Sequence, residues 1–148
     1  LTHPVKKAFY VREIAERAIG LTKDRVADSG AVCTYVEKSD DILLYADEGQ
    51  ITQILINLIK NATEADAGRI EITAEINLSE HVIINVFNDG RAISKESREE
   101  IFVPFFTTKQ EGTGIGLSLS RQIMRLHNGT LTLTQSDENG TIFTLIFR

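Results

Sequence analysis

The chain has 148 residues, of which 42% are hydrophobic and 25% charged, proportions typical of one soluble globular domain. Its formal net charge of -5 argues against a general attraction to nucleic acid or to an anionic membrane surface. The single cysteine, Cys33, excludes an intrachain disulfide, and no apolar run is long enough to span a bilayer. Because the first residue is Leu1 rather than methionine, we expect a piece of a longer protein that has further domains.

The first part of the chain predicts a helix, a pair of strands and a second helix. Apolar residues recur at helical spacing over 10–30, which ends in a glycine. Two short β-rich runs, 31–37 and 42–47, are separated by a polar turn, as in a hairpin. The segment 47–66 is strongly amphipathic, and Asp47 is a plausible N-cap for a helix there.

The second part predicts a hairpin over 69–89, a short polar helix over 94–102 and a loop over 103–114. A helix over 115–129 and a closing hairpin over 130–148 follow. Strands thus come as antiparallel pairs with helices between them. This order predicts an α+β fold, a two-layer sandwich in which a mixed, mostly antiparallel sheet carries its helices on one face.

Two asparagines mark one side of the second predicted helix. Asn57 and Asn61 lie four residues apart, beside the apolar stripe that includes Leu58, Ile59 and Ala62. A neutral amide at the edge of a buried face offers a carbonyl oxygen, which suits a Mg²⁺ ion that carries a triphosphate. A pair of ordinary surface asparagines is the alternative.

One predicted strand ends in Asn88-Asp89-Gly90, which is turn chemistry. Alternation along this strand places Asn88 on the same face as the apolar residues Ile84 and Val86. A polar side chain on an apolar face needs a partner, so Asn88 is a candidate binding residue as well as a turn residue.

The stretch QEGTGIGLSLS, residues 110–120, has glycines at every second position before a helix: Gly112, Gly114 and Gly116. Successive glycines let backbone amides converge on an anion, and a helix N-terminus adds partial positive charge. The spacing matches neither the dinucleotide fingerprint nor the Walker motif. A glycine-rich hinge in a flexible loop is the alternative.

The preceding stretch, FVPFFTTK, combines three phenylalanines with two threonines and a lysine. The aromatic residues can hold one end of a mobile loop, while Thr107, Thr108 and Lys109 remain available to phosphates. A satellite hydrophobic cluster with a solvated lysine is the alternative.

The histidines offer neither a metal site nor a catalytic set. They lack metal-ligand spacing, and no Ser/His/Asp or Cys/His arrangement can be assembled with them. We expect surface positions for all three: His3, His81 and His127.

In this order and at these gaps, the motifs resemble the catalytic ATP-binding domain of sensor histidine kinases. The wider family includes gyrase, mismatch-repair ATPases and heat-shock chaperones, and its fold is called the Bergerat fold. The resemblance runs from about Phe9 to Phe147. QILINLIKNATEA resembles the asparagine box, NVFNDGRAI the first glycine box and IFVPFFTTK the phenylalanine box. GTGIGLSLSRQIMRLHNGTL resembles the second glycine box with its helix, and NGTIFTLIF the closing strand.

The resemblance implies roles for individual residues. Asn61 would be the Mg²⁺ ligand, and Asn57 would lie beside the phosphates and help to position ATP. Asn88 takes the place of the aspartate that binds the adenine amino group, Gly90 would let the base approach, and Thr141 would support adenine through water. The other nucleotide-binding residues would be Thr107, Thr108 and Lys109 in the lid, Gly112, Gly114 and Gly116 around the phosphates, and Leu117.

Three positions depart from the family pattern. Asn88 stands where an aspartate is usual, and Ala92 replaces the second glycine of the same box. Glu64 stands three residues after Asn61, where many relatives carry a basic residue. The adenine site is therefore the part of the pattern that this chain follows least.

The resemblance implies that residues 1–148 form one catalytic domain of a protein histidine kinase. It would bind Mg-ATP and transfer the γ-phosphoryl group to a histidine on a separate dimerisation domain, so the isolated domain would not autophosphorylate. The implied partners are that dimerisation domain and the receiver domain of a response regulator, with neither nucleic acid nor direct membrane contact.

The resemblance implies that the domain lies in the cytoplasm. This holds even if the full-length protein is anchored in a membrane. Two alternatives remain. Another ATPase of this fold would need a glutamate where Asn57 stands. A degenerate domain would serve only as a scaffold that binds a partner.

Overall fold

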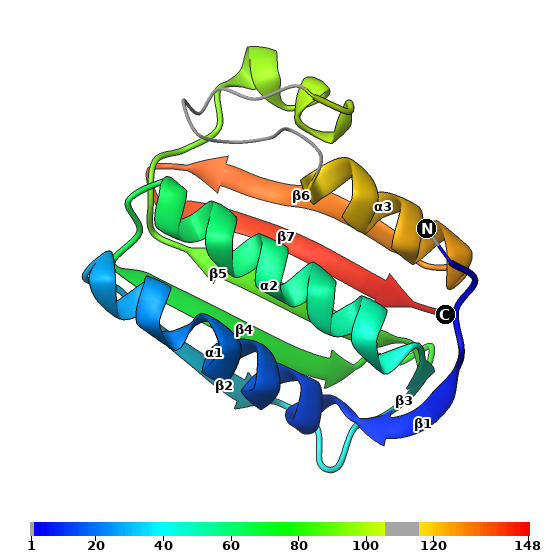
Figure 1. The fold of residues 1–148 in the computed structure, drawn as a ribbon. Helices are drawn as coiled ribbons and strands as arrows, with labels where there is room; N and C mark the ends of the chain where they lie inside the picture. Colours follow the sequence, from blue (N-terminus) through cyan, green and yellow to red (C-terminus); the bar gives the residue numbers. More distant parts are fainter. Residues whose placement is uncertain (1, 106–115) are drawn as a thin grey trace.

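The computed structural model describes residues 2–105 and 116–148 (Figure 1). The first half contains β1 (Lys7–Tyr10), α1 (Val11–Asp28), β2 (Val32–Glu37), β3 (Leu43–Ala46) and α2 (Glu48–Glu64). The second half contains β4 (Arg69–Ile76), β5 (Val82–Asn88), the 3₁₀ turns η1 (Lys95–Ser97) and η2 (Glu100–Phe102), α3 (Gly116–Leu126), β6 (Thr130–Asp137) and β7 (Gly140–Phe147).

The main sheet has five strands in the order β2-β4-β5-β7-β6. Only the β2–β4 pair is parallel, and the other neighbours are antiparallel. The helices α1, α2 and α3 all lie over one face of this sheet (Figure 1). The predicted α+β sandwich with a mixed, mostly antiparallel sheet is therefore confirmed.

The prediction that 31–37 and 42–47 form a hairpin is wrong. β3 instead pairs with β1 in a small antiparallel sheet, and β2 pairs with β4 of the main sheet. Both strands have the alternating burial that a hairpin would show, with Leu44 and Ala46 buried in β3. Alternation fixes which face of a strand is buried but not which strand lies beside it, so a local pattern could not separate these pairings.

The expected short helix at 94–102 is replaced by η1 and η2, two 3₁₀ turns of three residues each. The segment has no stripe of apolar residues at helical spacing, and its backbone is held instead by a neighbouring strand. The backbone N–H of Ile93 donates to Oγ of Ser136 at 2.7 Å, and Arg98 donates to the carbonyl oxygen of Ser136.

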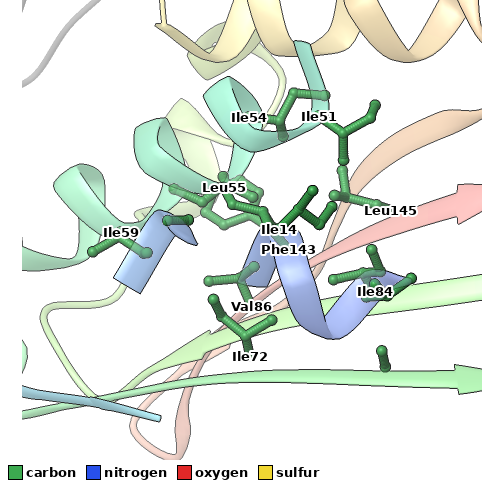
Figure 2. Packing of buried hydrophobic residues seen from close by; sticks show 14 of the residues in the cluster. Ile14, Ile51, Ile54, Leu55, Ile59, Ile72, Ile84, Val86, Phe143 and Leu145 are labelled. Atoms are coloured by element: carbon green, nitrogen blue, oxygen red, sulfur yellow. The ribbon is translucent and has the colours of Figure 1, made fainter. Parts of the chain in front are cut away.

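The core lies between the helices and the sheet (Figure 2). Each large aliphatic side chain buried there contributes roughly 1.5–3 kcal/mol of hydrophobic stabilisation. The fully buried members on the helices include Ile14, Ile51, Ile54, Leu55 and Ile59, and those on the strands include Ile72, Ile84 and Leu145. This packing fixes the rotation of α2, and therefore the position of the asparagines along its edge.

His127 and Asp47 meet at the N-terminus of α2. His127, expected at the surface, is buried, with 7% of its surface exposed, because the last turn of α3 packs against the N-terminus of α2. Asp47 caps α2 as expected, since its Oδ1 accepts from the backbone N–H of Gln50 at 3.0 Å.

Over the residues that the structure describes, no helix has both the length and the apolar character to cross a membrane.

Candidate functional site

A cavity of about 270 Å³ opens beside the C-terminal half of α2, where β5 and β7 meet the 3₁₀ turns. Four residues predicted to bind nucleotide line it: Asn61, Asn88, Leu117 and Thr141. The rest of the lining consists of Ala65, Arg91, Ala92, Ile93, Ser94, Ser97, Ile101 and Phe143. The fold thus brings together residues that lie as far apart in the sequence as α2 and the last strand.

The floor of the cavity is polar and deeply buried. Asn88 and Thr141 are directly opposite each other in the β5–β7 register, and only 5% and 2% of their surfaces are exposed. Oγ1 of Thr141 shares a 2.7 Å hydrogen bond with Oγ of Ser136, and Oδ1 of Asn88 accepts from the N–H of Gly90 at 2.9 Å. The burial of Asn88 on the face of Ile84 and Val86 confirms the alternation argument.

The walls are largely apolar. Ile93, Ile101, Leu117 and Phe143 contribute side chains, and the ring of Phe102 packs edge-on against Phe143 with centroids 6.3 Å apart. Apolar walls above a floor with a few fixed polar groups suit a flat heterocyclic base. The residues present therefore fit the flat base of a nucleotide.

Phe102, which packs against the lining residue Phe143, is itself held by α3. The Arg121 guanidinium lies over the Phe102 ring, 3.6 Å from its centroid, and its Nε and Nη2 donate to the carbonyl oxygen of Leu131. Partial burial, with a smaller effect of the nearby Arg125 charge, lowers the pKa of Arg121. The pattern of the helix gives no signal that would assign this role to Arg121 from sequence.

The two asparagines of α2 have different surroundings. Asn61 lines the cavity, whereas Asn57 faces α3. Nδ2 of Asn57 donates to Oγ of Ser120 at 3.2 Å and to the carbonyl oxygen of Gly116 at 3.4 Å, while its Oδ1 accepts from Gln53. Among the described residues no group of three or more His, Cys, Asp or Glu side chains could hold a metal ion. The role of Asn61 as a Mg²⁺ ligand stays a prediction.

Gly90 is required by packing. A Cβ atom at this position would lie 2.5 Å from the carbonyl oxygen of Ala65, at the end of α2. That oxygen also accepts from the backbone N–H of Arg91 at 2.8 Å. The role of Gly90 in admitting the base remains a prediction, but its lack of a side chain already follows from this close approach.

The turn after β5 is held by the carboxylate of Asp89. Its Oδ1 accepts from the backbone N–H groups of Gly68 and Arg69, each at 2.8 Å. The hydrogen bond from the backbone N–H of Arg69 lowers the pKa of the Asp89 carboxyl. Desolvation acts in the opposite direction, and the hydrogen bond from the backbone N–H of Gly68 lowers the pKa further. In the sequence motif Asn88-Asp89-Gly90, therefore, the aspartate serves the fold and the asparagine faces the cavity.

Arg91, which the sequence did not single out, lies at the rim of the cavity. Its guanidinium pairs with the carboxylate of Asp66 and donates to the carbonyl oxygen of Glu64 at 2.9 Å. Two serines at 94 and 97 also reach the lining from η1 and the residue before it. Only the fold, which brings this segment back over α2, reveals these three positions.

Five predicted site residues lie outside the described part of the chain: Thr107, Thr108, Lys109, Gly112 and Gly114. Gly116 is described, and it begins α3 in contact with Asn57, where an added Cβ would be 3.7 Å from Cγ.

Comparison with known proteins identifies the class. Residues 46–148 match the family described as histidine kinase-, DNA gyrase B-, and HSP90-like ATPase. The chain therefore belongs to this ATPase family. Its resemblance to the catalytic domain of sensor histidine kinases is confirmed by individual relatives and by a solved structure.

The sensor histidine kinase ZraS of Salmonella typhimurium is 36% identical over 104 residues, which are 69% of this chain and 22% of that protein. Sporulation kinase A of Bacillus subtilis is 31% identical over 146 residues, which are 97% of this chain and 24% of that protein. The chain thus spans about a quarter of the length of either relative.

The nucleotide-free catalytic domain of histidine kinase ThkA superposes with a TM-score of 0.85 at 32% identity, covering 96% of this chain and 94% of the ThkA domain. A further structure contains ThkA in complex with the response regulator protein TrrA, and it superposes with a TM-score of 0.79.

Proposed function

We propose that this catalytic domain binds Mg-ATP in the cavity and transfers the γ-phosphoryl group to a histidine on a separate dimerisation domain. The observation that carries the proposal is the meeting of Asn88 and Thr141 on the cavity floor with Asn61 and Leu117 on its sides. This set of residues occurs in a chain that belongs to the histidine kinase-like ATPases.

In the proposed complex, the base lies between the apolar walls, over Asn88 and Thr141. Asn61 would hold the Mg²⁺ ion through its carbonyl oxygen. When bound, the ion supplies charge neutralisation to the phosphate oxygens, which is the main requirement of phosphoryl transfer. Gly112, Gly114 and Gly116 would present backbone amides to the phosphates, and Thr107, Thr108 and Lys109 would close over them.

The chain's contribution to the reaction is positioning. The N-terminus of α3 carries partial positive charge, which would hold the phosphates while leaving the γ-phosphoryl group open to an acceptor. The acceptor histidine lies on the dimerisation domain, and a response regulator would then receive the phosphoryl group. The complex of ThkA with TrrA supports this second partner, because the match to ThkA covers 96% of this chain, although only 41% of the ThkA chain. The proposed location of the domain is the cytoplasm.

The nucleotide site is tested by calorimetric titration of the chain with ATP and ADP, with and without Mg²⁺. Asn61→Ala should lose the part of the ATP affinity that depends on Mg²⁺, because a carbonyl ligand disappears, and should bind metal-free ADP nearly as before. The matched control is Asn139→Ala, which removes an exposed amide in the β6–β7 turn and should change neither value. Mg²⁺ dependence that survives in Asn61→Ala would show that another group is the ligand.

The transfer step is tested with radiolabelled ATP. The chain alone should gain little label, and addition of a matching helical acceptor domain should place acid-labile label on a histidine of that domain. Acid-stable label on a serine would indicate a serine kinase instead. ATP hydrolysis without an acceptor would favour an ATPase of the chaperone or topoisomerase type, although Asn57 stands in the place of its glutamate. Absence of any nucleotide binding would favour the scaffold alternative.

A further inference from the structure

A hydrogen-bonded junction joins α2 to the first two turns of α3. Asn57 is its centre, with the Nδ2 group directed at Ser120 and Gly116 and the Oδ1 atom directed at Gln53, whose Nε2 donates at 3.0 Å. Ser120 is fully buried, with 0% of its surface exposed. Its hydroxyl therefore meets the Asn57 amide in a place where water cannot replace that partner.

The junction fixes the orientation of the Asn57 amide. An asparagine amide can turn by half a rotation and exchange its oxygen for its nitrogen. Here Gln53 supplies a donor on one side, and Ser120 and Gly116 supply oxygens on the other. Only one orientation satisfies all three contacts, and the Ser120 hydroxyl provides the shorter of the two bonds to α3, at 3.2 Å against 3.4 Å.

The same contact determines how α3 sits against α2. Gly116, the first residue of α3, rests on the Asn57 side chain, since a Cβ there would lie at an ordinary contact distance of 3.7 Å from Cγ. Asn61 is one helical turn further along α2 and lines the cavity, as does Leu117 of α3. The Asn57–Ser120 bond thus lies between the two elements whose spacing a bound triphosphate must match.

We propose that Ser120 is a positioning residue for the triphosphate. Acting through Asn57, it holds the N-terminus of α3 at the distance from Asn61 that the phosphates and Mg²⁺ require. The inference rests on the proposed nucleotide site and adds to it a residue that does not line the cavity. The base would bind at the other end, on Asn88 and Thr141, so loss of Ser120 should affect the phosphates and not the base.

The first test compares ligands with and without phosphates. Ser120→Ala in the 148-residue chain should weaken Mg-ATP binding by roughly 3- to 10-fold, the expected effect of one lost buried hydrogen bond. Adenosine binding, followed by NMR shifts, should stay within twofold of wild type. The matched control is Thr22→Val, which removes another buried hydroxyl, bonded to the Ala18 carbonyl in α1, and should leave both affinities unchanged.

The second test is a double-mutant cycle with Asn57→Ala. If Ser120 acts through Asn57, then Ser120→Ala has no further effect on Mg-ATP affinity once Asn57 is replaced. Additive losses, equal losses for ATP and adenosine, or unchanged ATP affinity in Ser120→Ala would overturn the inference and leave the proposed function intact. A wild-type chain that bound neither ATP nor adenosine would overturn both.

Discussion

The side-chain oxygen of Asn88 accepts a hydrogen bond from the backbone N–H of Gly90 at 2.9 Å. One lone pair of the amide oxygen is therefore already engaged by the turn, and the other polar group of the side chain is an NH₂ donor. An aspartate at this position would have a second oxygen, so it could hold the turn and still accept from an adenine amino group. Asn88 cannot do both equally well.

Asn88→Asp should therefore raise ATP affinity about fivefold. Hydrogen bonds to a charged acceptor contribute about 1.5–3 kcal/mol, against about 0.5–1.5 kcal/mol for neutral pairs, so the difference is about 1 kcal/mol. GTP affinity should not rise, because guanine carries a carbonyl where adenine has its amino group. Titration of both proteins with both nucleotides measures this. If the variant bound ATP no better, either residue 88 does not face the base or Ala92 has closed the pocket.

Gly90→Ala should destabilise the fold. The new methyl group would meet the Ala65 carbonyl oxygen at 2.5 Å, and the backbone at both sites would have to move, which costs about 1–3 kcal/mol. Gly49→Ala is the control, since its nearest neighbour is an Asp47 oxygen at 3.6 Å and a helical alanine is favoured over glycine. Urea unfolding of the two variants separates these effects. A stable Gly90→Ala protein that had lost adenosine binding would instead assign the glycine to the approach of the base.

The sequence was sufficient for the parts of the fold that depend on local periodicity. The stripe on α2 and the alternation of β5 predict where Asn61 and Asn88 lie, and the structure places both side chains at the cavity. Strand pairing was harder to predict from the sequence. β2 finds its partner in β4, with Tyr35 opposite Ile72, and nothing in either segment specifies that distant match.

The site residues also divide into those that the sequence predicts and those that only the packed structure reveals. The motifs and the family resemblance indicated residues on α2, β5 and β7. Ser120 and Arg91 lie inside quoted motifs, but nothing in the sequence distinguishes them there from other helix and turn residues. Their contacts, with Asn57 and with Asp66, cross between elements and exist only once those elements are packed. His127 was misplaced for a related reason, because a polar residue in a last helical turn is usually solvated unless a second element covers it.

Cys33 should react slowly with iodoacetamide in the folded chain. Burial raises the pKa of the Cys33 thiol to about 11, so at pH 8 the thiolate fraction is roughly two-hundredfold below that of an ordinary cysteine with a pKa of about 8.5. Alkylation in 6 M urea should be at least about tenfold faster than in buffer. Equal rates in the two conditions would show that the thiol is accessible and unperturbed.

The same pKa predicts a pH dependence of stability. Because the folded state favours the neutral thiol, this stabilisation is complete below the pKa of unfolded cysteine, about 8.5, and is lost as the pH rises toward 11. Cys33→Ala should remove this part of the alkaline loss, which unfolding curves at several pH values would measure.

His127→Phe should lower the stability of the domain without removing the aromatic ring. Nε2 of His127 accepts from the backbone N–H of Asp47 at 3.0 Å, so the ring proton lies on Nδ1, which donates to the Ile123 carbonyl at 2.8 Å. Phenylalanine would fill the space but leave the buried Asp47 N–H without its acceptor, which costs about 1–3 kcal/mol, whereas the Ile123 carbonyl keeps the backbone N–H of residue 127 at 3.2 Å. His3→Ala, at an exposed position, is the control and should change nothing measurable. Hydrogen exchange at the Asp47 amide should also speed up in His127→Phe, since that amide loses its acceptor. If urea unfolding and the Asp47 exchange rate both matched wild type, the contact between the end of α3 and the start of α2 would have to be held by packing alone.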